Sequence, residues 1–313
     1  MLKAIPALRR IGVALVGAAR AMWSHEIPRD AGAIAYFSLF ILFPAILVLF
    51  AVVYAFLGIW DLRAPVVDRI LLLFPGSAPF LRKNLLEITR PSPALFLSCF
   101  IVVIWGSTWI FTFLENALNR AWGVPRRRTF WESRIRSIAL LVLGGTMLLI
   151  SAIITFVVDA MKTQAETLSP AFAKDQIILT FWKWPIWAAG ILIAIVVFLF
   201  VYKLMPDCPI RWTEALTGSI VATILWEFDW EIFIKLVPVF DSQKVYGTTG
   251  FIIALLTWLY ASSLITLFGA NFSAKLHGAR ENGEAGRDSL PGPSQPISRK
   301  VRTFPPRGAM MDP

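Results

Sequence analysis

Three acidic residues and a lysine lie close together in a stretch of the chain that is otherwise aromatic and aliphatic. The run WEFDWE occupies residues 226–231, and Lys235 follows it. At helical spacing Glu227, Glu231 and Lys235 share one face, whereas Asp229 points elsewhere. A carboxylate that borders a cavity in a membrane binds a cation, a lipid amine or a proton. Glu227 is therefore the leading candidate for a ligand-binding residue, and Glu231 is the next.

The depth of Glu227 along a membrane-spanning helix separates two interpretations. If that helix begins near Thr213, Glu227 lies about 20 Å along it, roughly two thirds of the way across a hydrocarbon core of about 30 Å. A glutamate at that depth is expensive and should face the helix bundle or a water-filled cavity. In the other interpretation this helix end rises into the outer interface, where the neighbouring tryptophans anchor it and Glu231 pairs with Lys235.

A second polar group ends another apolar run and consists of Glu115, Asn116, Asn119 and Arg120. Glu115 and Asn119 are four residues apart, as are Asn116 and Arg120, so each pair shares a helix face. One interpretation is a polar lining or gate at the inner end of a span. The other is a helix end that reaches water and makes interhelical hydrogen bonds. Asn271 could bond Glu115 if the helices that carry them are neighbours.

Two residues of the first long apolar run are further candidates for a cavity lining. Pro44 should kink a helix and free a backbone carbonyl, and core packing is the alternative explanation for it. Tyr36 stands near the inner end of the same run, where it could also be an aromatic anchor at the membrane interface.

Motifs for other kinds of chemistry are absent from the sequence. It contains no GxxxxGK(S/T) nucleotide loop, no HExxH, no GxSxG and no paired CxxC. The two histidines, His25 and His277, have no second His or Cys at metal-ligand spacing, and Cys99 and Cys208 are expected to be structural. We predict no cofactor, no bound metal and no enzymatic activity.

The composition indicates that a lipid bilayer surrounds these residues. Hydrophobic residues make up 57% of the chain and charged residues 16%, with a mean hydropathy of +0.66. Soluble domains average roughly 45–50% hydrophobic residues and about 25% charged residues. Because a spanning helix needs about 20 apolar residues, we predict an all-α bundle of six transmembrane helices. The predicted spans are residues 31–58, 93–116, 136–160, 180–203, 213–236 and 246–274.

The segments outside the spans have their own signatures. Residues 1–30 combine apolar residues at helical spacing with arginines, which indicates an amphipathic cytoplasmic helix on the membrane surface or packed on the bundle. The transmembrane domain takes residues 31–275 and includes an apolar connection, 59–93, with predicted short helices. Residues 276–313 are rich in proline, glycine and basic residues, so we predict a disordered basic cytoplasmic tail.

The basic residues are distributed unevenly between the two sides of such a bundle. With a cytoplasmic N-terminus and six alternating spans, cytoplasmic segments hold 20 of the 30 Lys and Arg residues and outer segments hold 10. Acidic residues divide equally, so the bias follows the positive-inside rule. Both termini are therefore expected in the cytoplasm of a plasma-membrane protein. The net charge of +10 needs no nucleic-acid partner to explain it.

Four stretches, in order along the chain, resemble the YihY / virulence factor BrkB family of bacterial inner-membrane proteins. They are AYFSLFILFPAILVL at 35–49, LENALNRAWGVPRRRTFW at 114–131, LMPDCPIRWTEALTGSIVATILWE at 204–227 and VYGTTGFIIALLTWLYASSLITLFGANFSA at 245–274. The resemblance implies a six-helix integral protein of the bacterial inner membrane but no settled activity. Asn271 replaces the glutamate usual after Gly-Ala in that family, and Thr248 replaces a common serine.

The leading hypothesis is a protein that binds or transports a lipid or a small solute without hydrolysing ATP. Its expected partners are membrane lipids and that substrate, and the oligomeric state stays open. The alternative is a non-catalytic membrane scaffold or envelope-integrity factor whose partners dock on the basic loop at 123–136 or on the tail. Some members of the resembling family carry the old label ribonuclease BN, but a metal nuclease needs clustered Asp, Glu or His residues. The sequence shows no such cluster.

Overall fold

The predicted all-α class is confirmed. A computed structural model describes residues 4–57, 93–124, 130–168, 176–240 and 248–288, and within these ranges the chain forms helices and no strand. The helices are α1 (Ala4–Met22), α2 (Glu26–Leu57), α5 (Pro93–Ala121), α6 (Phe130–Leu168), α8 (Gln176–Leu204), α9 (Trp212–Phe240) and α10 (Thr248–Asp288).

Several helices extend past the predicted spans. α10 continues to Asp288, so the first residues of the segment predicted as a disordered tail are helical. The reason is that no proline follows until Pro291, and the intervening residues include alanine, glutamate and arginine, which favour helix. The predicted short helices at 59–93 and the arginines at 126–128 fall, apart from Pro93, outside the described residues.

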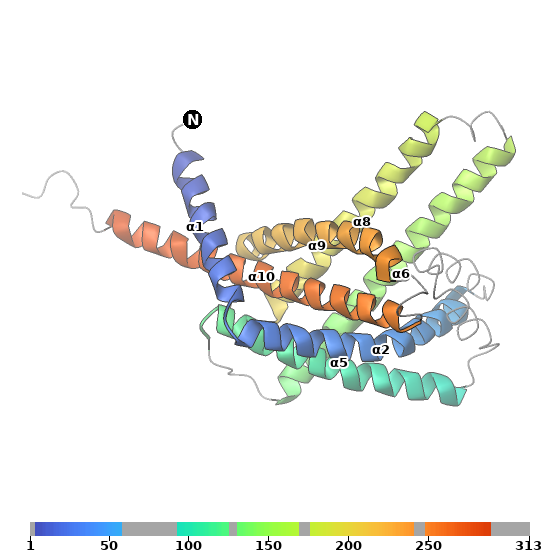
Figure 1. Cartoon of the computed structure of the whole chain (residues 1–313), viewed down its shortest axis with the longest axis horizontal. Coiled ribbons are helices and arrows are strands. Elements are labelled where there is room, and N and C mark those ends of the chain that lie inside the picture. The colour runs from blue at the N-terminus through green and yellow to red at the C-terminus, as the bar shows by residue number, and fades with distance from the viewer. Residues whose placement is uncertain (1–3, 58–92, 125–129, 169–175, 241–247, 289–313) are drawn as a thin grey trace, which may run out of the picture.

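Six of the helices pack in a closed order. α2 packs against α5, α5 against α6, α6 against α8, α8 against α9, α9 against α10, and α10 returns to α2. Figure 1 shows α2, α5, α9 and α10 running side by side, while the distal parts of α6 and α8 extend away from them. The tightest packing therefore lies toward one end of the bundle.

The surface of this bundle suits a hydrocarbon environment. Large apolar side chains such as Val142, Leu192 and Phe228 are more than 60% exposed, which is costly in water. By length and composition five helical segments qualify as membrane spans; they lie in α2, α5, α6, α8 and α10. α9 is not among them because its carboxylates lower its hydropathy. The predicted count of six spans therefore stays a prediction.

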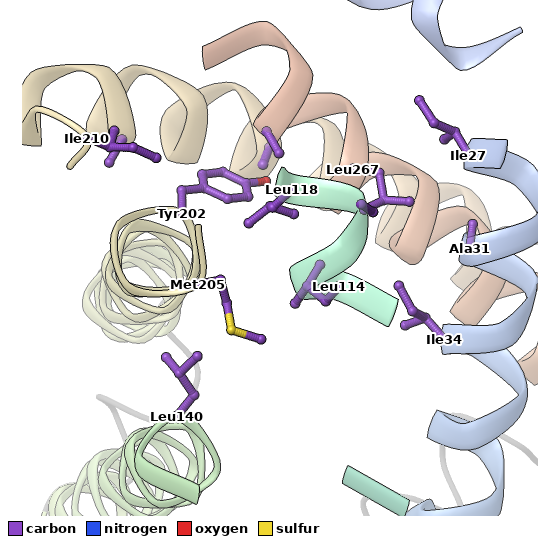
Figure 2. Packing of buried hydrophobic residues seen from close by; sticks show 14 residues of the cluster. Ile27, Ala31, Ile34, Leu114, Leu118, Leu140, Tyr202, Met205, Ile210 and Leu267 are labelled. Atoms are coloured by element: carbon purple, nitrogen blue, oxygen red, sulfur yellow. The ribbon is translucent and has the colours of Figure 1, made fainter. Parts of the chain in front are cut away.

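The buried core gathers where the closely packed helix ends meet. Tyr202 of α8 and Met205, which directly follows α8, approach Leu118 of α5, and Leu267 of α10 completes the contact (Figure 2). The phenol of Tyr202 donates a 2.8 Å hydrogen bond to the carbonyl oxygen of Thr266, so this large ring is buried without an unsatisfied hydroxyl. The whole cluster also includes residues of α2, α6 and α9, so the core fixes the relative positions of the helices at this end.

α9 and α10 approach each other through glycines. A Cβ atom on Gly269 would lie 2.5 Å from the Tyr202 hydroxyl oxygen and 2.8 Å from the Cβ of Ala222. A Cβ on Gly218 would lie 2.9 Å from the carbonyl oxygen of Gly269 and from the Cβ of Ser273. Small residues of this kind let helix backbones come close inside a membrane.

The N-terminal helix α1 crosses α10 at a steep angle (Figure 1). Ala14 and Ala18 are buried against Phe272, whereas Val13 and Val16 on the other side are exposed. One side of α1 therefore packs on the bundle, which is one of the two arrangements predicted for residues 1–30. Its opposite side is apolar and exposed, and is available for contact with the membrane surface, which is the other predicted arrangement.

Candidate functional site

Polar side chains connect the helices at the closely packed end of the bundle. We call this set the polar layer; its members are Asp30, Glu115, Asn119, Arg120, Ser133, Asp207, Glu214 and His277. They come from the starts of α2, α6 and α9, from the last turns of α5, from the segment after α8 and from the C-terminal half of α10. The layer therefore joins alternate ends of six successive helices.

An ion-pair cluster holds α2 against α5 in this layer. The guanidinium of Arg120 contacts the carboxylate of Asp30, which is buried, and its Nε lies 3.0 Å from Oε2 of Glu26. Arg29 lies 3.5 Å from the same aspartate. Removing one partner of a buried pair is strongly destabilising because it leaves an uncompensated charge. Arg120 thus fixes the start of α2.

The predicted group at the end of α5 makes interhelical hydrogen bonds. Glu115 is buried and accepts a hydrogen bond from the hydroxyl of Ser133 in α6. The amide of Asn119 donates to Oδ2 of Asp207 at 3.1 Å, and its oxygen accepts from the Asp207 backbone N–H at 2.8 Å. Two bonds in fixed geometry clamp the segment after α8 onto α5.

Glu214 connects the start of α9 to α10. Its carboxylate, with 5% of the side chain exposed, lies 2.7 Å from Nδ1 of His277 and accepts a 3.3 Å bond from the Arg211 backbone N–H. The latter contact is half of a capping box, in which a residue in the first turn satisfies the N-cap amide. The hydroxyl of Ser273 donates to the Glu214 carbonyl oxygen at 2.7 Å, and Trp122 stacks at an angle on His277.

The acidic residues of α9 differ in their surroundings. Ser262 of α10 donates a 2.9 Å hydrogen bond to Oδ2 of Asp229, which is half-buried between the two helices. Glu231 is exposed, and its Oε2 lies 3.9 Å from Nζ of Lys235. That pair is the contact expected if this end reaches the outer interface. Glu227 is half-buried and lies one turn before Glu231 on the same side of α9.

Aromatic rings surround the same level of α9 and α10. Trp226 and Trp230 stack with ring centroids 6.4 Å apart, and each also contacts Trp258 of α10 at 6.4 and 5.5 Å. Phe233 stacks on Trp258 at 5.2 Å. With Asp229 and Ser262 these four residues form what we call the aromatic–carboxylate site.

The remaining predicted residues occupy varied positions. Asn116 is half-buried in α5, and Asn271 is buried and donates to the Leu267 carbonyl oxygen of its own helix at 2.8 Å. Tyr36 is 60% exposed and packs edge-on against Phe37. Pro44 lies inside α2, which continues beyond it. The predicted Asn271–Glu115 bond and the cavity roles of these residues stay predictions.

Sequence reasoning did not select Asp30, Asp207 or Glu214, and it placed Asp229 behind Glu227. Glu214 had a usable signal, because an acidic residue in the first turn of a helix is favoured there. Asp229 had none, since its contact with Ser262 spans 33 residues. Nor did the two histidines gain metal partners: no group of three or more His, Cys, Asp or Glu in the described ranges could hold a metal ion.

Long apolar helices with exposed apolar surfaces, joined by a buried polar layer, define an all-helical integral membrane protein. Residues 18–291 match the family described as Virulence factor BrkB. Because the match covers most of the sequence, the chain belongs to this family. The resemblance inferred from the four stretches is thereby confirmed.

Several named relatives are similar over most of this chain. A UPF0761 membrane protein of Chromohalobacter salexigens is 26% identical over 83% of this chain and 62% of its own length. The ribonuclease-like protein YfkH of Bacillus subtilis is 24% identical over 81% of this chain and 91% of its own. A UPF0761 membrane protein of Aliivibrio fischeri is 28% identical, over 79% and 77% respectively. No solved structure matches the chain.

Proposed function

We propose that this protein binds a lipid or a small solute and moves it across a bacterial inner membrane alongside α9. The observation that carries the proposal is the carboxylate of Asp229 between α9 and α10. Its hydrogen-bond donor is the neutral hydroxyl of Ser262, and within the described residues it forms no ion pair. An acidic group inside a membrane bundle is expensive, and such groups mark substrate and ion pathways.

Glu227 adds a second carboxylate at the same level of α9, on a different side of the helix from Asp229. It precedes Asp229 by two residues, is half-buried, and forms no ion pair within the described part of the chain. Two carboxylates without a cationic partner favour a ligand with a positive group or a coupled proton or cation. Because the sequence contains no nucleotide loop, the movement is passive or coupled to an ion or proton.

The orientation that we propose puts the polar layer at the cytoplasmic face. Support comes from the surplus of Lys and Arg in the segments that flank this end of the helices. Ser133, Asp207 and Glu214 lie beside these basic segments, and Glu227 and Asp229 lie about three and a half turns or more further along α9 than Glu214. A ligand would therefore meet the carboxylates beyond the cytoplasmic closure of the bundle.

Mass spectrometry of lipids and small molecules that co-purify with gently extracted protein tests the proposal. The variants are Glu227→Gln and Asp229→Asn, which remove charge and keep shape. Glu231→Gln is the matched control, because this exposed carboxylate pairs with Lys235 on the same helix. We expect a specific molecule on the wild type and on the control that is lost from both test variants.

Two results together would contradict the proposal. The wild type and the three variants would carry the same bulk lipid mixture, and all four would transport lipids and solutes equally after reconstitution into vesicles. Weight would then move to the scaffold hypothesis, which requires no embedded charge on α9.

A further inference from the structure

The aromatic–carboxylate site combines a carboxylate on α9 with aromatic rings on the facing sides of α9 and α10. On α9, Asp229 follows Trp226 by three residues and precedes Phe233 by four, so the three share one side of the helix. On α10, Trp258 and Ser262 are four residues apart and share the side that faces them. A carboxylate is thus set among tryptophan rings.

Within the described ranges, neither the Asp229 carboxylate nor the tryptophan rings have a cationic partner. No Lys, Arg or His of the described ranges lies over these rings or pairs with Asp229. The indole N–H of Trp258 is buried, and no described residue accepts a hydrogen bond from it. Leaving a buried donor and a half-buried charge unsatisfied is costly in a protein interior.

We propose that this site binds an organic ammonium group, such as the head of an ethanolamine lipid or a free alkylammonium solute. The positive group lies against the faces of Trp226 and Trp230 and beside the Asp229 carboxylate. In an ethanolamine lipid, an oxygen next to the ammonium accepts the Trp258 N–H. This inference rests on the proposed function and names the chemical class of its ligand.

The ring faces decide the class of cation. A bare metal ion needs several oxygen or nitrogen ligands, and the described residues provide no cluster of three at this place. An alkylammonium has a diffuse charge and an apolar surface, so aromatic faces attract it strongly when it is desolvated. The tryptophans thus favour the organic cation over sodium or potassium.

The binding test uses full-length protein in nanodiscs of phosphatidylglycerol. It is titrated with tetramethylammonium chloride and, as the comparison, with potassium chloride at the same concentrations. Tryptophan fluorescence reports binding, since three tryptophans line the site. We expect saturable quenching by tetramethylammonium alone. Asp229→Asn keeps an acceptor for Ser262 and should weaken binding at least about tenfold.

Three further variants separate cation recognition from folding. Trp230→Leu should weaken binding by roughly three- to thirtyfold, and Trp230→Phe should restore most of it, because the ring face carries the attraction. Glu231→Gln should bind as the wild type does. Equal quenching by potassium, or unchanged binding in both Asp229→Asn and Trp230→Leu, overturns the proposal.

A second arm identifies the source of the ammonium. In nanodiscs of mixed lipids, native mass spectrometry compares retention of phosphatidylethanolamine with that of phosphatidylglycerol. Retained phosphatidylethanolamine that tetramethylammonium displaces indicates a lipid head, and tetramethylammonium binding without lipid preference indicates a soluble ammonium. A specific co-purifying ligand without an ammonium group refutes this inference and leaves the proposed function standing.

Discussion

Gly269 has no room even for a single methyl group as a side chain. A Cβ there would lie 2.5 Å from the hydroxyl oxygen of Tyr202 and 3.0 Å from the carbonyl oxygen of Gly218. We expect Gly269→Ala to destabilise the fold by about 1–3 kcal/mol, as overpacking does. The melting temperature in detergent measures the effect.

Gly190→Ala is the matched control for that prediction. Gly190 also lies within a helix, but nothing stands within 4 Å of its added Cβ. Alanine should stabilise the helix there by about 0.5–1 kcal/mol. If Gly269→Ala raised the melting temperature as well, the close approach of α9 and α10 would be refuted.

His277 provides a second prediction at the residue scale. Its Nδ1 lies 2.7 Å from the buried carboxylate of Glu214, so His277→Ala removes a partner from a group that water does not reach. We expect a loss of about 1–3 kcal/mol in the free energy of unfolding. Lys235→Ala breaks only an exposed contact with Glu231 and should change stability by less than about 0.5 kcal/mol. Equal effects would show that the Glu214–His277 contact is not a structural tie.

The element of greatest interest is α9, which hydropathy alone does not select. Apolar side chains on one stripe of α9 are exposed at four-residue steps: Leu216, Ile220, Ile224, Phe228 and Ile232. Such a stripe suits contact with lipid, and 29 residues extend about 43 Å, longer than the hydrocarbon core. We therefore expect α9 to be the sixth span.

Cysteine labelling in intact membranes tests this assignment of α9. With Cys99 and Cys208 replaced by alanine, Ile224→Cys should react with a water-soluble maleimide at least about tenfold more slowly than Arg211→Cys, since lipid excludes the reagent. Arg211 precedes the helix and is exposed. Rapid labelling at position 224 would remove α9 from the membrane.

Across the whole molecule, the polar layer determines how the helices alternate. It joins the start of α2 to the end of α5, the end of α5 to the start of α6, and the start of α9 to α10 near His277. Successive helices therefore run in opposite directions, and α2 begins at the end of the bundle at which α10 finishes. With six spans, reporters fused to either terminus should both be cytoplasmic. Reporters on opposite sides would require an odd number of crossings.

The sequence alone was sufficient for the membrane location and the all-helical class, because hydropathy over about 20 residues is a local property. It also supplied the family through four ordered stretches, and it identified Glu115 and Asn119 as polar groups at a helix end. Tertiary structure decided which groups meet. Asn119 bonds Asp207 across 88 positions, and Asp229 rather than Glu227 bonds α10. These contacts depend on how closely two helices approach and on which of their sides face each other. Glycines and buried core residues at distant positions determine both.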